Sequence, residues 1–293
     1  MMTRSNTFWK LSLLLFCIVF LGIGATKLFL SIRRAQLNSA LVGEIKTHKD
    51  VGTVVSLLSQ GADPNARDLA QDTRPFWTQL WDRMRGKPIL TGDPPTALQT
   101  ALLGTKKRPW RDEDLPVIKA LLDAGARPDV ANAYGDTPLM LATRIRPLEV
   151  LDLLLQHGAP VNAQNYKGVA ALHEAVDSNN LELVSLMLSR GALVNIRDKY
   201  GAIPLHAAAA EGELQVTRLL LANGSEIEVQ NTDGYTPIGL AVCSNEIDTV
   251  KLLLAHGARL DAGNNRGHTL LYWAQEFHYE AMVRVLKRAG AKQ

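Results

Sequence analysis

The sequence has few of the residues that mark the more specialised classes of protein. Only 2 of its 293 residues are cysteine and 13 are proline, which excludes a disulfide-stabilised scaffold and a collagen-like chain. Aromatic residues contribute only 6%, yet hydrophobic residues reach 46%, which is ordinary for a globular protein and excludes a disordered chain. The chain therefore has enough apolar residues to form a core.

The net charge is also small: 32 Lys and Arg residues and 29 Asp and Glu residues give +3. Residues 1–34 hold five basic side chains and no acidic one, so the rest of the chain is faintly acidic. A broad cationic surface is therefore absent, and we expect no nucleic-acid partner.

Motifs that carry chemistry are missing as well. The chain has no His-Glu-x-x-His, Cys-x-x-Cys, Gly-x-Ser-x-Gly or phosphate-loop pattern. We therefore expect no enzyme activity, no metal, no cofactor and no small-molecule substrate. The distant alternative is an enzyme whose site lies within residues 69–114, where the acidic candidates are Asp72, Asp82, Asp93 and Asp112.

One long apolar run lies near the N-terminus, from Leu11 to Leu30. At about 1.5 Å per residue, a helix of this length spans the ~30 Å hydrocarbon core of a bilayer. The run predicts a single membrane anchor within residues 1–34. The alternative is a cleaved signal peptide with small residues at Gly22–Ala25, which would release a secreted or periplasmic protein.

The charges that flank this run indicate its orientation. Arg4 and Lys10 precede it, whereas five basic residues lie within or after its C-terminal end, namely Lys27, Arg33, Arg34, Lys46 and Lys49. Because basic flanks favour the cytoplasmic side, we expect the following domain in the cytoplasm. A periplasmic or extracellular domain is the alternative.

A period of 33 residues organises the remaining sequence. Gly-Ala or Gly-Ser pairs start at Gly125, Gly158, Gly191, Gly224, Gly257 and Gly290, and a second glycine series keeps the same period at Gly135, Gly168, Gly201, Gly234 and Gly267. Two short helical patterns lie in each unit, such as one that begins at Pro204 and one with an apolar stripe from Leu214 to Leu221. Because such short helix pairs cannot bury their apolar faces alone, we expect them to stack into a solenoid.

The period and its motifs resemble the ankyrin repeat family. The element Thr-Pro-Leu-His-x-Ala is matched most fully at Ile203–Ala208, and leucine triplets occur at Leu153–Leu155, Leu219–Leu221 and Leu252–Leu254. The resemblance, to a membrane-anchored ankyrin protein of bacterial type, implies an all-α solenoid of helix pairs with β-turn fingers, preceded by the transmembrane helix. It also implies a structural hydrogen-bonding role for His173 and His206, which are too far apart to share a metal ion.

The places where the sequence departs from the 33-residue period indicate the boundaries between the parts of the chain. We expect an anchor in residues 1–34 and a repeat domain in residues 35–293, built from an N-terminal cap unit (35–68), an insertion (69–94), an elongated unit (95–131) and five regular units (132–293). The final unit carries Arg284, Lys287 and Arg288 on its last helical pattern, as a terminal cap in water should.

The insertion contains a short amphipathic pattern whose apolar side is formed by Phe76, Trp77, Leu80, Trp81 and Met84. Three interpretations stay open. The pattern could fold back over the first unit, bind a partner protein, or lie on the membrane surface beside the anchor.

In ankyrin proteins the turn tips and the inner helix faces line a concave surface that binds other proteins. Carried over to this chain, the resemblance implies a partner-binding set of Arg144, Asp177, Trp273, Lys199, Asn231, Asn264 and the tyrosines Tyr134, Tyr166, Tyr200 and Tyr235. Tyrosine and tryptophan offer large contact areas at low entropic cost. Each of these side chains could equally be an ordinary surface residue.

Overall fold

The computed structural model describes residues 26–27, 29–47, 50–67, 94–103, 114–144 and 148–291. Residues 29–47 are helical and precede α2 (Val51–Ser59). The further helices are α4 (Ala97–Leu103), α5 (Leu115–Asp123), α6 (Pro138–Thr143), α7 (Leu148–Gln156), α8 (Ala171–Asp177), α9 (Leu181–Ser189), α10 (Pro204–Ala210), α11 (Leu214–Ala222), α12 (Pro237–Cys243), α13 (Ile247–Ala255), α14 (Leu270–Glu276) and α15 (Glu280–Arg288). The described residues contain isolated β-bridges but no strand.

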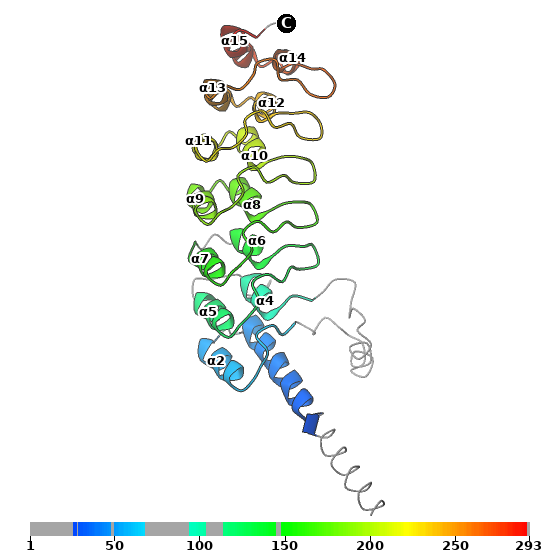
Figure 1. Ribbon diagram of the computed structural model, residues 1–293, viewed down its shortest axis with the longest axis vertical. Helices are drawn as coiled ribbons and strands as arrows, with labels where there is room; N and C mark the ends of the chain where they lie inside the picture. Colours follow the sequence, from blue (N-terminus) through cyan, green and yellow to red (C-terminus); the bar gives the residue numbers. More distant parts are fainter. Residues whose placement is uncertain are drawn as a thin grey trace, which may run out of the picture.

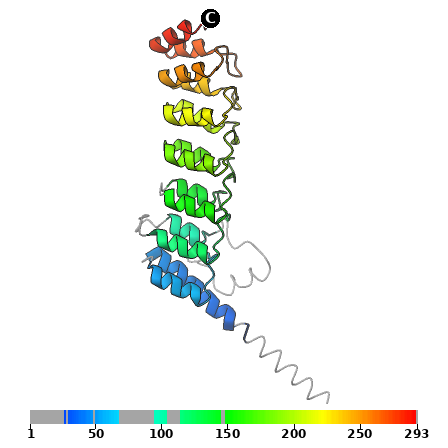
Figure 2. The ribbon, with the colours of Figure 1, turned by 60° about the vertical axis from the view of Figure 1, so that its left-hand side comes forward.

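The helices form antiparallel pairs that stack in one direction into an elongated solenoid (Figures 1 and 2). The first helix of each pair, here called the inner helix, contacts the inner helices before and after it, as α10 contacts α8 and α12. The second, outer helices form a parallel column, in which α11 contacts α9 and α13. Between one pair and the next, the chain projects sideways as a loop, here called a finger (Figure 1). The predicted solenoid is therefore present.

The core is a column of equivalent residues spaced by 33 positions, except for the 41 positions that separate Leu98 from Leu139. One inner-helix position is buried in every pair, as Leu98, Leu139, Leu172, Leu205, Ile238 and Leu271. One position of the outer helices is likewise buried, as Leu121, Leu154, Met187, Leu220, Leu253 and Leu286. Each buried leucine contributes about 2 kcal/mol of transfer free energy, and it does so only because a neighbouring pair covers it.

The backbone N–H groups in the first turn of each short inner helix have no acceptor within the helix, so they need a capping side chain. Threonine supplies it in four pairs, where the hydroxyl accepts from the backbone N–H three residues on, namely Thr96, Thr137, Thr236 and Thr269. Proline at the first position removes one of these donors in α6, α10 and α12. The expected start of α10 at Pro204 is confirmed.

The predicted insertion leaves and re-enters the stack at one point. Arg67 and Thr96 form an antiparallel bridge, and the Ala97 N–H donates to the Ala66 carbonyl at 2.7 Å. Gln164 and Ala170 form the equivalent bridge across a regular finger. The two described ends of the predicted insertion therefore lie side by side, paired as the two sides of a regular finger are. The amphipathic pattern from Phe76 to Met84 lies outside the described residues.

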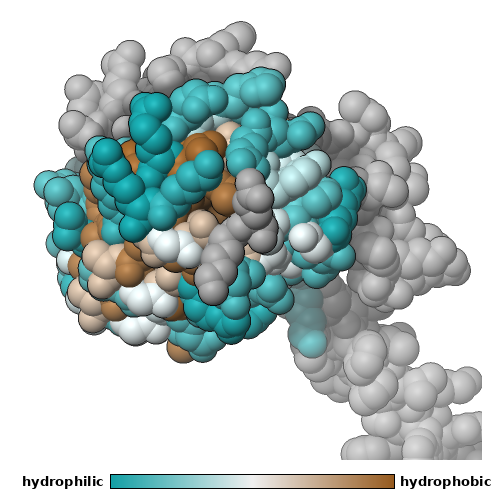
Figure 3. Space-filling view, turned by 90° about the horizontal axis from the view of Figure 1, so that it is seen from above, coloured by the Kyte–Doolittle hydropathy of each residue, from teal (hydrophilic) through white to brown (hydrophobic). Residues whose placement is uncertain are grey.

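The two ends of the stack differ. At the C-terminal end, Arg284, Lys287 and Arg288 are exposed on α15, and hydrophilic side chains cover much of that end (Figure 3).

Most of the predicted anchor, including Leu11, lies outside the described residues, and Leu30 is 60% exposed. Among the residues that the structure describes, no helix is long and apolar enough to cross a bilayer.

Backbone hydrogen bonds join each finger to the next. The donors and acceptors are Tyr166 N–H to Tyr134 O (3.2 Å), Lys199 N–H to Lys167 O (2.9 Å), Thr232 N–H to Tyr200 O (2.7 Å) and Asn265 N–H to Asp233 O (3.0 Å). The contact is so close at Gly168 (φ +74°) that an added Cβ would lie 2.6 Å from the Lys199 nitrogen. Glycine is required there for its conformation and for its size.

We predict that Gly168→Ala lowers the free energy of unfolding by about 2–4 kcal/mol, because it adds a steric clash to the cost of a left-handed alanine. Gly158→Ala is the matched control, since Gly158 has φ +83° but no atom within 4 Å of an added Cβ. The control should lose only about 1 kcal/mol. Urea unfolding followed by circular dichroism measures both, and equal losses would contradict the tight finger contact.

Candidate functional site

A polar side chain at the start of each finger closes its turn. Asn165 Oδ1 accepts from the N–H groups of Lys167 (2.9 Å) and Val169 (3.1 Å). The same pair of bonds is made in the other fingers by Asn132, Asp198, Asn231 and Asn264. The side-chain oxygens of Asn231 and Asn264, two residues of the predicted binding set, therefore hold the shape of their own fingers.

The finger tips carry exposed aromatic side chains on this fixed backbone. Tyr134, Tyr166 and Tyr200 are 75%, 78% and 56% exposed, and the first two are joined by the backbone bond between their fingers. The Lys199 ammonium lies 4.8 Å from the centre of the Tyr200 ring, which is a cation–π distance. These four predicted residues thus form a row along the fingers.

Tyr235 takes a different position, because it comes two residues later in its finger than Tyr200 does in the preceding one. It is half-buried, and its hydroxyl accepts from Asn264 Nδ2 at 3.1 Å. Its ring centre lies 6.2 Å from that of Trp273 on the inner helix α14. Tyr235 therefore links the last fingers to the helix surface.

Trp273 is the centre of an aromatic group in the last repeat. Its ring contacts His268 edge-on at 5.0 Å and stacks on Phe277 at 5.4 Å, while His268 stacks on Tyr272 at 4.2 Å. Trp273 is half-buried, whereas Tyr272 and Phe277 are exposed. The sequence analysis included Trp273 and Tyr235 but missed His268, Tyr272 and Phe277, which lie within five residues of Trp273.

Arg144, at the C-terminal end of the inner helix α6, is held by carboxylates. Its guanidinium contacts both oxygens of Glu174 on α8, with Nη2–Oε1 at 2.8 Å and Nε–Oε2 at 3.2 Å, and lies 3.5 Å from Asp136. The hydrogen bond to Glu174 raises the pKa of Arg144 further. About half of its side chain stays accessible, so it remains available to a partner.

Asp177 lies one repeat further along, at the position that corresponds to Arg144. It is exposed, and partial burial of the carboxyl raises its pKa, with further contributions from Glu174 and Glu211. The equivalent surface thus changes from positive to negative over a single repeat. Asp177 and Arg144 do not form an ion pair with each other.

The two histidines of the repeat motif are structural, as expected. Nδ1 of His206 accepts from the Ile203 N–H at 3.1 Å, and Nε2 donates to the Tyr235 carbonyl of the next repeat at 3.0 Å. His173 makes the corresponding bonds to Ala170 and Ala202. Burial lowers the pKa of both rings, which is consistent with neutral imidazoles.

Gln99 performs the same task in the elongated unit, which the sequence analysis did not anticipate. Its Oε1 accepts from the Thr96 N–H at 2.9 Å, and its Nε2 donates to the Val130 carbonyl at 2.8 Å. An amide and a neutral imidazole each offer one acceptor and one donor, so Gln99 can close its helix turn as the histidines do, although its donor bond stays within the elongated unit.

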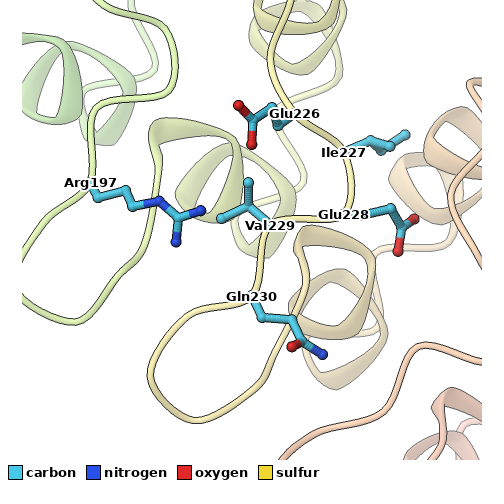
Figure 4. A pocket seen from close by; sticks show the side chains of 6 residues that line it. All are labelled: Arg197, Glu226, Ile227, Glu228, Val229 and Gln230. Atoms are coloured by element: carbon cyan, nitrogen blue, oxygen red, sulfur yellow. The ribbon is translucent and has the colours of Figure 1, made fainter.

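A surface pocket of about 440 Å³ lies beside the loop that follows α11 (Figure 4). Its lining residues are Arg197, Glu226, Ile227, Glu228, Val229 and Gln230. Glu228 Oε1 accepts from the Arg259 N–H, which is a bond between repeats. Within the part of the chain that the structure describes, no group of three His, Cys, Asp or Glu side chains is suited to a metal ion.

The comparison with known families agrees with this architecture. A model described as ankyrin repeats, in three copies, matches residues 110–198 and again residues 204–293, which together are more than half of the chain. The chain belongs to the ankyrin repeat family. Ankyrin repeats indicate a protein–protein interaction module and are typically not enzymes. No curated protein matches this sequence significantly.

The histidine bonds make the stability of these ankyrin repeats dependent on pH. Because the folded pKa of His206 lies below its ordinary value of 6.5, the unfolded chain takes up the proton first as pH falls. The contribution of the neutral ring is complete above about pH 6.5 and is lost as pH falls through the folded pKa.

We predict that His206→Gln preserves both bonds, as Gln99 does, and changes the free energy of unfolding at pH 7 by less than about 1 kcal/mol. His206→Leu leaves the Ile203 N–H without its side-chain acceptor, while the Tyr235 carbonyl keeps only its bond from the Asn231 N–H. This loss should cost about 2–3 kcal/mol. The glutamine variant should also lose less stability than the original chain between pH 7 and pH 5. Urea titrations at both pH values measure this, and a glutamine variant as unstable as the leucine variant would refute the assigned bonds.

Proposed function

We propose that this protein is a non-enzymatic adaptor, scaffold or stabiliser that is tethered to a membrane and binds a partner protein along its fingers and inner helices. The observation that carries the proposal is the row of exposed tyrosines on a hydrogen-bonded finger backbone. Such a row presents large side chains whose spacing is already fixed, so that little entropy is lost on binding.

The aromatic group around Trp273 supports the same proposal. Aromatic side chains in contact with one another and partly open to solvent are typical of binding hot spots. Through Tyr235 the group adjoins the finger surface, so the predicted residues from both elements contribute to one face. Arg144 and Asp177 extend this face with charges of opposite sign.

The tether is supported by the apolar run from Leu11 to Leu30 and by the basic residues that follow it. In this proposal the helix of residues 29–47 leads directly from the anchor into the first repeat, and the repeats lie on the cytoplasmic side. A cleaved leader would instead release the repeats as a secreted or periplasmic binding protein.

We predict that Tyr200→Ala combined with Trp273→Ala weakens capture of the partner at least tenfold in intact-cell cross-linking of the full chain, because both remove large contact surfaces. The matched control is Val55→Ala with Leu193→Ala, which truncates exposed apolar residues in α2 and after α9. Circular dichroism verifies that both variants fold. Equal capture by both double variants would rule out the proposed face.

We predict that the full chain stays in the membrane fraction after an alkaline carbonate wash, because the apolar run spans the bilayer. N-terminal sequencing of the mature protein should begin at or near Met1. A chain that is washed off and begins after Gly22–Ala25 would favour the released form and contradict the tether.

A further inference from the structure

Four carboxylates from three successive repeats gather around Gly212. Asp177 ends α8, Glu211 and Glu213 flank Gly212 between α10 and α11, and Glu246 precedes α13. A methyl group added at Gly212 would collide with the Glu246 carboxylate, which therefore lies directly against this turn. We refer to these four residues as the acidic cluster.

The acidic cluster lacks a cation of its own. Among the described residues, none of its four members takes part in an ion pair. Glu213 is only 8% exposed, and its Oε2 is buried with no hydrogen-bond partner. Burial, and after it the charges of Glu211 and Asp177, raise the pKa of Glu213 to about 7. An unpaired buried carboxyl is costly, so a cation beside it would be strongly stabilising.

The first regular repeat shows how the same face satisfies acidic side chains. There the guanidinium of Arg144 reaches across to Glu174 of the next repeat and to Asp136. The positions that correspond to Arg144 in the next three repeats are Asp177, Ala210 and Cys243, and none of these can supply a cation. Ala207 and Ala210 on α10 are also short and partly exposed.

We infer that the acidic cluster receives an arginine side chain from the partner protein, which would pair with its carboxylates as Arg144 pairs with Glu174 and Asp136. The planar guanidinium donates several hydrogen bonds in a fixed geometry and matches carboxylates better than an ammonium does. The short alanines of α10 leave space for the aliphatic part of the arginine. The inference rests on the proposed function and specifies the chemistry of the partner.

A random 12-residue peptide library displayed on phage, selected against the full chain, tests this inference. We expect selected peptides to share an arginine, and expect Asp177→Asn with Glu211→Gln to weaken their binding at least tenfold. The control, Glu182→Gln with Glu226→Gln, makes the same change in net charge at exposed acids elsewhere and should leave binding within twofold.

Replacing the shared arginine of a selected peptide by citrulline keeps its shape and removes its charge. This change should weaken binding to the original chain about tenfold and have little effect on binding to the Asp177→Asn, Glu211→Gln variant. Equal effects on both chains would overturn the arginine assignment.

The remaining outcomes separate the two proposals. Peptides that lose binding with Tyr200→Ala and Trp273→Ala but need no arginine would overturn the inference and leave the proposed function standing. Peptides that respond to neither the aromatic nor the acidic variants would overturn both.

Discussion

Each helix pair in this protein buries its apolar surface only against the pair before it and the pair after it. An isolated pair of helices of seven and nine residues is too short to be stable in water, so every repeat depends on its neighbours. The equivalent residues of the core column, most of them leucines, are buried because neighbouring pairs cover them. Backbone bonds between fingers and the histidine bonds between repeats then fix the register of one pair on the next.

Because the framework repeats, the positions between its fixed residues are free to vary, and function is located there. One inner-helix position is Arg144, Asp177, Ala210, Cys243 and Glu276 in five successive repeats. The backbone places these side chains at regular intervals whatever their chemistry. A change from a satisfied guanidinium to an unpaired acidic cluster therefore alters what the face can bind without altering the fold.

The repeat could be predicted from the sequence because glycine, proline and leucine recur for local physical reasons. Gly224 adopts the left-handed conformation expected at a helix end, and Pro204 begins α10 where a missing N–H is harmless. The neutral state of His206 and the burial of Glu213 could not be predicted in this way. They depend on carbonyls and carboxylates that other repeats place nearby, and such contacts between repeats leave no pattern within a single one. The predicted partner-binding residues were chosen by analogy with the family, and the structure gives their positions.

The claim that the repeats stack as equivalent units of 33 residues is tested most directly by deleting one whole repeat. Removal of residues 202–234 takes out α10 and α11 and joins Gly201 to Tyr235, which fuses the first part of one finger to the last part of the next in register. The account predicts a folded chain with the same helical signal per residue in circular dichroism and a cooperative urea transition. A control that deletes 30 residues, 202–231, breaks the register and should not fold. If both deletions unfold the chain, or both are tolerated, stacking in steps of 33 residues is not what holds this protein together.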